Sequence, residues 1–290
     1  MNKLKGVGVA LVTPFNEDLS VDFDSLTKLV EYNIENGTNY LVVLGTTAEA
    51  ATLSKEEKQQ VSEHIVKVNN GRLPLVLGIG GNNTLEVKKQ IQETDLSAYD
   101  AVLSVSPYYN KPNQEGLYQH YKALAETGKN IIIYNVPGRT GQNVEAETTL
   151  RLAKDFPNLI MIKEATSNIS QYFDILRKKP EHFSLVSGDD ELALPVTLAG
   201  GDGVISVIGQ GLPKEFSIMI QLALDGKVKE AYEIHNRLVE IIRLIFVEGN
   251  PCGIKTILAE KGIIKNYLRL PLIPASEGLQ NKIKEELAKI

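Results

Sequence analysis

The sequence predicts an α/β fold, a single (β/α)8 TIM barrel with a C-terminal helical extension. The chain has 290 residues, 43% of them hydrophobic, and such barrels use about 250 residues as one folding unit. Short apolar runs start roughly 20 to 35 residues apart, about the length of a βα unit, with helical patterns between them. No Gly-x-Gly-x-x-Gly pattern follows the first run, so a closed barrel is favoured over an open, doubly wound sheet.

Eight apolar runs are expected to form the strands of this barrel. Most of them are continuously apolar rather than alternating, as is typical of parallel strands that are buried on both faces. The predicted strands are Val7–Thr13, Tyr40–Leu44, Leu75–Gly78, Ala101–Ser106, Ile131–Tyr134, Leu159–Lys163, Ser184–Ser187 and Gly203–Val207.

The segments between these runs carry signals for helix ends. Asp22 precedes an amphipathic segment and is a candidate N-cap, and Ser54 with Glu57 has the form of a capping box. Gly37 and Gly71 fall where helices are expected to end, because glycine readily adopts the left-handed conformation there.

Beyond the eighth run the pattern changes to helical periodicity alone. Three or four helices are expected between residues 214 and 290, interrupted at Asn250-Pro251, Pro271 and Pro274. No Gly/Ser-rich or highly charged linker separates this part from the rest. We therefore predict a barrel over residues 1–213 and a helical extension over residues 214–290 that packs on it.

The composition excludes several classes of protein. The formal net charge is -5 and basic residues do not cluster, so nucleic acid is not an expected partner. No apolar run approaches the ~20 residues that span a bilayer, and Met1 to Gly8 lacks the apolar stretch of a signal peptide. The single cysteine, Cys252, excludes an intrachain disulfide and fits a reducing compartment, so a cytoplasmic location is expected.

The active sites of such barrels lie at the carboxyl ends of the strands, and Lys163 stands at one of these ends. An ammonium group at the end of a buried strand loses hydration, which favours the neutral amine that can attack a carbonyl group. The alternative is a lysine that extends to solvent or pairs with a carboxylate. Glu164 follows directly and should face the other side of the sheet.

Hydroxyl groups stand at the ends of two other strands. Tyr134 ends the run next to that of Lys163 and could transfer protons, although a half-buried tyrosine with a satisfied hydroxyl group is as reasonable. Thr46 and Thr47 follow Gly45, and their hydroxyl and backbone N–H groups could hold a small carboxylate or merely form a turn.

Two further loops carry candidate residues. Tyr108 and Tyr109 follow the fourth run and resemble the anchors of a protein interface. Arg139 lies in a glycine-flanked loop after the fifth run, where its guanidinium group could bind a substrate carboxylate or remain solvated.

Other constellations do not indicate a site. The four histidines fall in or beside helical segments, so no metal-binding spacing and no Ser/His/Asp arrangement emerges. Asp189 and Asp190 are better explained as helix N-caps than as metal ligands. The glycines between residues 78 and 83 lack the spacing of a phosphate loop, and no metal or organic cofactor is expected.

Taken together, these residues resemble the N-acetylneuraminate lyase superfamily of class I aldolases, most closely its dihydrodipicolinate synthase branch. The resemblance covers nearly the whole chain, in order. It is carried by Gly8-Val9-Ala10-Leu11-Val12-Thr13-Pro14-Phe15, Gly45-Thr46-Thr47-Ala48-Glu49-Ala50, Pro107-Tyr108-Tyr109-Asn110-Lys111-Pro112, Tyr134-Asn135-Val136-Pro137-Gly138-Arg139-Thr140, Ile162-Lys163-Glu164-Ala165, Ser187-Gly188-Asp189-Asp190, Gly203-Val204-Ile205-Ser206-Val207, Asn250-Pro251 and Arg269-Leu270-Pro271-Leu272.

The resemblance implies catalytic roles for four residues. Lys163 matches the lysine that forms a Schiff base with pyruvate, and Tyr134 matches the general acid and base. Thr46 and Tyr109 match a hydroxyl relay to solvent, in which Tyr109 reaches into the site of a neighbouring subunit.

The resemblance also implies binding roles. Thr47 matches the cradle for the pyruvate carboxylate, and Arg139 matches the residue that receives the carboxylate of aspartate semialdehyde. Gly188 and Ile205 match positions whose backbone lines the pocket. Aldolases of the superfamily that act on sugar acids do not generally carry this arginine.

The implied reaction joins pyruvate and L-aspartate 4-semialdehyde to give 4-hydroxy-tetrahydrodipicolinate, the opening step of diaminopimelate and lysine biosynthesis. It needs no cofactor, and homotetramers built as dimers of dimers are usual in the family. The alternative is another pyruvate-dependent aldolase of the superfamily, acting on N-acetylneuraminate or a 2-keto-3-deoxy sugar acid. A non-catalytic barrel that senses a keto acid is a further alternative.

The sequence departs from the family pattern in two places. The usual Gly-Thr-Thr-Gly-Glu-Ser has Ala48 and Ala50, and Ala48 is tolerable only if that position does not need a positive φ. Asn82, Glu86 and Tyr108 match the family's allosteric lysine site, but Lys55 and Lys58 stand where lysine-inhibited members carry histidines. Because added cations disfavour a cationic ligand, we expect weak or absent inhibition by lysine.

Overall fold

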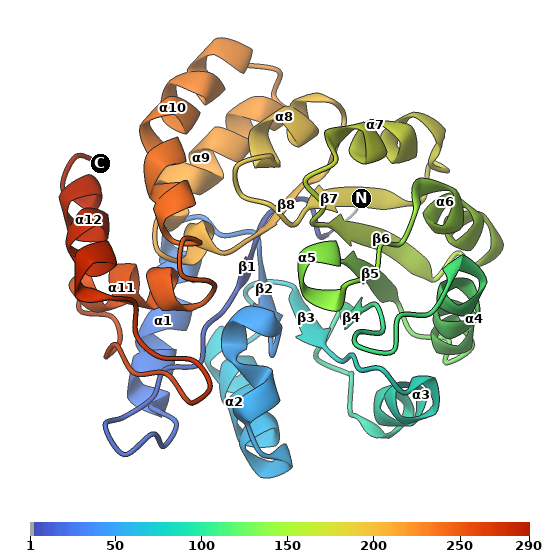
Figure 1. The fold of residues 1–290 in the computed structure, drawn as a ribbon, viewed down its shortest axis with the longest axis horizontal. Helices are drawn as coiled ribbons and strands as arrows, with labels where there is room; N and C mark the ends of the chain where they lie inside the picture. The colour runs from blue at the N-terminus through green and yellow to red at the C-terminus, as the bar shows by residue number, and fades with distance from the viewer. Residues whose placement is uncertain (1–2) are drawn as a thin grey trace.

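The computed structural model describes residues 3–290, and its centre is a closed barrel of eight parallel strands in sequence order (Figure 1). Met1 and Asn2, which belong to the predicted barrel segment, lie outside the described residues. The strands are β1 (Gly6–Ala10), β2 (Tyr40–Val43), β3 (Leu75–Gly78), β4 (Ala101–Val105), β5 (Ile131–Asn135), β6 (Leu159–Glu164), β7 (Ser184–Ser187) and β8 (Gly203–Ser206).

All eight predicted strands exist, and the predicted fold class is confirmed. β3 and β7 have the predicted bounds, whereas β1 is shorter because its run continues into a loop that contains Thr13. β5 and β6 each extend one residue further than predicted, to Asn135 and Glu164. Both residues are polar, so an apolar pattern could not include them.

Helices surround the barrel and follow its strands in turn (Figure 1). Asp22 caps the first of them, and the capping box of Ser54 and Glu57 forms as expected. Gly37 and Gly71 each lie one residue beyond a helix C-cap, at φ 90° and 70°. The helices of this part are α1 (Phe23–Glu35), α2 (Lys55–Asn69), α3 (Thr84–Glu93), α4 (Gln114–Ala125), α5 (Pro137–Thr140), α6 (Ala146–Asp155), α7 (Ile169–Lys178) and α8 (Ala193–Leu198).

Alternation along the strands divides the core into two clusters. The larger cluster fills the space between strands and helices, and the smaller one fills the barrel interior. The interior is packed by side chains from every strand; its buried members include Ala10, Val42, Val76, Leu103, Ile132, Tyr134, Met161, Val186 and Ile205. Tyr134 therefore belongs to the interior wall of the barrel.

Four helices follow β8, within the predicted range of three or four. They are α9 (Pro213–Leu224), α10 (Val228–Leu244), α11 (Cys252–Glu260) and α12 (Glu277–Leu287). α9 packs on β1 and closes the ring of barrel helices, and α10 packs on α9. α11 and α12 lie together beside α1 and α10 (Figure 1).

Across residues 3–290, every helix is too short or too polar to cross a membrane.

Candidate active site

Lys163 and Tyr134 lie side by side on the inner wall of the barrel. The two residues are paired across β5 and β6, so their side chains stand on the same face of the sheet. The Lys163 Nζ atom lies 4.3 Å from the centroid of the Tyr134 ring, and only 5% of Lys163 is exposed. The structure therefore brings together the two residues that were predicted to carry the central chemistry.

Gly188 provides the space that the Lys163 side chain occupies. A Cβ atom at this position would lie 2.9 Å from Lys163 Cε and 2.7 Å from Ala165 Cβ, closer than packed atoms approach. The Gly188 N–H donates to the Glu164 carbonyl at 2.6 Å, which fixes this close approach. Any side chain at 188 would displace the lysine.

Thr46 and Thr47 form a 3-10 turn, η1 (Thr46–Ala48), directly after β2. Thr46 is exposed, whereas Thr47 is buried and its Oγ1 accepts a hydrogen bond from Asn250 Nδ2 at 2.9 Å. At this turn the positive φ angles belong to the two residues that flank it, Leu44 at 56° and Glu49 at 54°. Ala48 has an ordinary φ, so the loss of the usual glycine leaves the turn intact.

The sequence predicted that Arg139 lies in a loop, but the structure places it in a short helix. Residues Pro137–Thr140 form one helical turn, α5, because proline suits the first helical position and Gly141 ends the turn at φ 69°. The Arg139 side chain is exposed, and its Nη2 atom donates to the Asn250 carbonyl at 3.3 Å, which joins the guanidinium group to the segment before α11.

The prediction that Asp189 and Asp190 cap the helix after β7 is wrong. The Asp189 carboxylate accepts from the N–H groups of Glu191 and Leu192, but α8 starts only at Ala193 and has no side-chain cap. Asp190 bonds instead to the backbone just after β8, where its Oδ2 accepts from the N–H groups of Val207 and Ile208 at 3.0 and 2.9 Å.

Complete burial raises the pKa of Asp190 to about 6, although the hydrogen bonds to its carboxylate lower it. These bonds fix the end of β8, where the buried Ile205 stands in the interior cluster.

The tyrosine pair and the possible allosteric residues lie on the outer surface near β4. Tyr109 is 89% exposed and has a φ of 72°, and Tyr108 is also exposed. Asn82 Nδ2 donates to the Tyr108 carbonyl at 3.1 Å, whereas Glu86 is exposed on α3. Within the single chain, these side chains do not enter the barrel interior.

Asn250 is a site residue for which the sequence indicated no role, because the Asn250-Pro251 pair was interpreted as a break between helices and as one of the family motifs. It contacts both Thr47 and Arg139, from a segment about 110 residues beyond the nearer of them. The Asn-Pro pair was visible in the sequence, but its place beside the barrel mouth depends on how α10 and α11 fold back. No periodicity argument could supply that information.

Comparison with known proteins gives one consistent result. The model of the Dihydrodipicolinate synthetase family matches residues 3–290. A 4-hydroxy-tetrahydrodipicolinate synthase from Flavobacterium psychrophilum is 56% identical over 284 residues, covering 98% of this chain and 97% of that protein. One from Parabacteroides distasonis is 52% identical over 288 residues, covering 99% and 97%.

A solved structure of the chloride-inhibited dihydrodipicolinate synthase from Acinetobacter baumannii, in complex with pyruvate, superposes with a TM-score of 0.95. It is 41% identical, and the match covers 99% of this chain and 98% of that one. The resemblance found in the sequence motifs is confirmed: the chain belongs to the Dihydrodipicolinate synthetase family.

Proposed function

We propose that this enzyme condenses pyruvate with L-aspartate 4-semialdehyde to give 4-hydroxy-tetrahydrodipicolinate, the opening step of diaminopimelate and lysine biosynthesis. The observation that carries the proposal is the buried Lys163 amine against the Tyr134 ring, in a space that exists because residue 188 is glycine. In residues 3–290 no carboxylate forms an ion pair with Lys163, so its amine is available for chemistry.

Imine formation uses Lys163 and Tyr134. The neutral amine adds to C2 of pyruvate, and the Tyr134 hydroxyl group transfers the protons that let the carbinolamine lose water. Thr46, at the start of the turn after β2, and Tyr109 of a neighbouring subunit would complete a hydroxyl relay to solvent. Thr47 and the adjacent backbone N–H groups would hold the pyruvate carboxylate.

Carbon–carbon bond formation follows from the iminium ion. The cation withdraws electrons, so a proton leaves C3 and an enamine forms. The enamine carbon attacks the aldehyde of the second substrate, while Arg139 pairs with that substrate's carboxylate. The substrate amine then attacks C2, closes the ring and releases the Lys163 amine. Gly188 and Ile205 would line the pocket through their backbones, and these steps require no metal or organic cofactor.

The assembly we propose is a cytoplasmic homotetramer, a dimer of dimers. The almost fully exposed Tyr109 supports a partner subunit, because a large aromatic side chain held outward at a positive φ gains contacts only in an interface. In this arrangement the Tyr109 phenol group would enter the active site of the partner subunit.

Feedback by lysine is expected to be weak or absent. Asn82, Glu86 and Tyr108 would form the ligand site, and Lys55 and Lys58 on the first turns of α2 would disfavour a cationic ligand. Isothermal titration calorimetry with lysine tests this expectation, and micromolar binding would contradict it.

Borohydride trapping tests the proposed reaction. Incubation with pyruvate and borohydride, followed by intact and peptide mass analysis, should place one reduced adduct on Lys163; no adduct would refute the Schiff-base mechanism. Arg139→Ala should still form this adduct but lose condensation with aspartate semialdehyde. If Arg139→Ala condenses that aldehyde normally, or if the wild type prefers sugar-derived aldehydes, the alternative aldolase activity is supported instead.

A further inference from the structure

The turn that carries Thr46 and Thr47 is held by an unusual residue, Glu49. This residue ends the turn in the left-handed conformation, with φ 54° and ψ 33°, which is unfavourable for a residue with a Cβ atom. Such a conformation persists where surrounding contacts fix it, and it is found disproportionately at functional sites. The contacts of the Glu49 side chain therefore bear on the function of the turn.

The Glu49 carboxylate is fully buried and bonded through both oxygens. Oε1 pairs with Lys255 Nζ at 2.5 Å, and both side chains have no exposed surface. Oε2 accepts a hydrogen bond from the Arg269 backbone N–H at 3.0 Å. Both partners come from the part of the chain that follows β8, more than 200 residues from Glu49.

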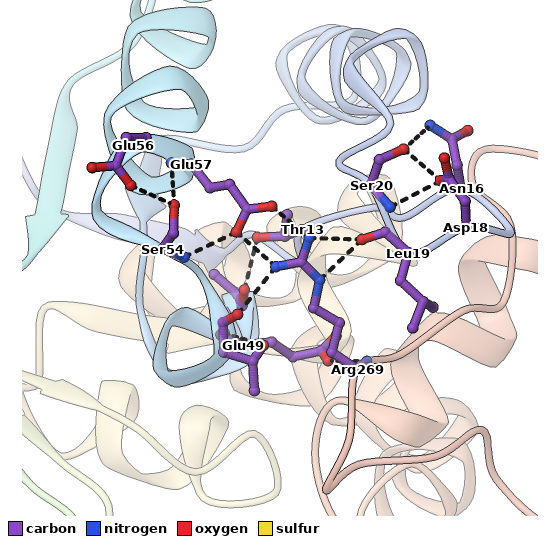
Figure 2. A network of polar contacts seen from close by, with 12 residues as sticks. Thr13, Asn16, Asp18, Leu19, Ser20, Glu49, Ser54, Glu56, Glu57 and Arg269 are labelled. Carbon is purple, nitrogen blue, oxygen red and sulfur yellow. Dashed lines mark hydrogen bonds and ion pairs between the residues drawn. The ribbon is translucent and has the colours of Figure 1, made fainter.

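Arg269 extends the connection to the outer side of the turn. Its guanidinium group donates to the Glu57 carboxylate and to the Leu19 carbonyl (Figure 2). It also donates to the Thr52 carbonyl. Both cations lie against the Phe15 ring, with Lys255 Nζ 4.3 Å and Arg269 Cζ 4.5 Å from its centroid. The Lys255 ammonium group also donates to the Tyr267 carbonyl at 2.9 Å.

The same C-terminal region contacts the turn at a second point. Asn250, five residues before Lys255, donates to Thr47 Oγ1, and its carbonyl accepts from Arg139. On the opposite side, Thr13 Oγ1 donates to the Ala48 carbonyl at 2.7 Å. The turn is thus joined to the α11 region at two points: Thr47 bonds to Asn250, and Glu49 bonds to Lys255.

We propose that the buried Glu49–Lys255 pair is a positioning device for the Schiff-base site. The pair fixes the position of the Thr46–Thr47 turn relative to α11. The C-terminal extension thereby determines how tightly the turn binds the keto-acid carboxylate. This inference rests on the proposed function. A buried ion pair is a poor source of stability, because desolvation offsets its attraction and apolar side chains of similar volume do as well. The pair instead fixes the position of Glu49, because each of its two carboxylate oxygens is bound to a different partner.

The double variant Glu49→Gln/Lys255→Met tests the proposal. It removes both charges together, keeps the volume of both side chains and leaves an amide oxygen for the Arg269 N–H. The pyruvate concentration for half-maximal borohydride trapping of Lys163 should rise about tenfold, less than the ~100-fold that a 1 Å misplacement of a catalytic group can cost. Hydrogen exchange at the amides of Ala48 and Glu49 should accelerate.

The matched control is Glu31→Gln/Arg72→Met, which removes an exposed, doubly hydrogen-bonded ion pair between α1 and the end of α2. It should lower Tm slightly and leave half-maximal trapping unchanged. A merely structural role for Glu49–Lys255 would give the same pattern, so a folded double variant with unchanged half-saturation overturns the proposal.

Two outcomes keep this inference separate from the proposed function. If the wild type forms no pyruvate adduct, the proposed function fails and the positioning role fails with it. If the wild type forms the adduct and the variant saturates identically, only the positioning role fails. Should the double variant not fold, Glu49→Asp keeps both charges but withdraws the carboxylate from Lys255 by one methylene group. A smaller rise in half-saturation then supports the role, and no rise overturns it.

Discussion

β5 and β6 carry two cross-strand pairs of residues that face opposite sides of the sheet. One pair carries the proposed chemistry, and the other is part of a buried hydrogen-bond network. Tyr134 and Lys163 face the barrel interior, where the amine lies against the ring. Asn135 and Glu164, each one residue further along, face the surrounding helices. The inner pair keeps its polar atoms available for a substrate, whereas the outer pair is saturated with hydrogen bonds.

The outer pair forms the centre of a buried polar network. The Glu164 carboxylate accepts from Asn135 Nδ2 at 2.8 Å, from Gln171 Nε2 at 2.8 Å and from the Thr166 N–H at 3.0 Å. Asn135 Oδ1 also accepts from the Val144 N–H, beyond the helical turn that carries Arg139. Rigid hydrogen bonding on the outside of the sheet thus fixes the strands that present reactive groups on the inside.

The largest expected effect is on the inner pair. Lys163→Met should abolish the pyruvate adduct and lower the rate of condensation by about 10⁴-fold or more, because no other amine can form the imine. Mass analysis after borohydride treatment and a steady-state assay measure both effects, with an unchanged circular dichroism spectrum as the control. Condensation at a substantial rate in this variant would contradict the proposed mechanism.

Tyr134→Phe separates the ring from its hydroxyl group. The ring against Lys163 remains, so packing should be preserved, but proton transfer to the carbinolamine is lost, with a cost of about 10²–10⁴-fold in kcat. Single-turnover trapping should show slow formation of the imine rather than weak binding of pyruvate. A variant with normal kcat would assign the proton transfer to another group.

The inner pair was also the part of the site most open to sequence reasoning. Lys163 is the one charged residue in the predicted strand runs, and active sites of such barrels lie at the strand ends, so the sequence alone predicts a catalytic role for it. The eight strands followed from the same apolar runs. Asn135 and Glu164 were excluded from their strands because polar residues end an apolar pattern, although both lie in the sheet.

The parts that sequence reasoning could not reach depend on contacts between distant segments. Asn250 beside Thr47, and Lys255 against Glu49, each join residues more than 200 positions apart. Asp190 was expected to cap the following helix but bonds to the backbone after β8 instead. Local propensity describes a residue's neighbours in sequence, so it cannot select among such remote partners.

The outer pair should govern stability rather than rate. Asn135→Leu removes one of the donors to the buried Glu164 carboxylate and should lower the free energy of unfolding by about 3 kcal/mol, because the carboxylate loses a hydrogen bond and the buried Val144 N–H loses its acceptor. Chemical denaturation at pH 7 measures this loss. The folded variant should still form the pyruvate adduct on Lys163; its absence would show that the two faces are not separable.

The pH dependence of stability should carry the signature of Glu164. Burial raises the pKa of this carboxyl group from 4.5 to about 7, although the hydrogen bonds from Asn135 and Gln171 lower it. Protonation therefore favours the folded state: this contribution is complete below about pH 4.5 and is lost as the pH rises through about 7.

Glu164→Gln removes that titration. Its free energy of unfolding relative to the wild type should increase by about 3 kcal/mol between pH 4.5 and 7.5. Denaturation curves for both proteins across this range measure the difference. A constant difference would mean that Glu164 titrates in the folded protein as it does in the unfolded chain.

The smallest effect is expected at an exposed ion pair, where an equally short contact should contribute less to stability. Lys88 Nζ lies 2.7 Å from the Glu126 carboxylate, as short as the bonds to Glu164, but both side chains are partly exposed. Water competes for both charges, so Lys88→Ala should change the free energy of unfolding far less than Asn135→Leu does, and less still at high salt. Denaturation at two salt concentrations measures this. A loss as large as that of Asn135→Leu would show that bond length, rather than burial, decides what these contacts contribute.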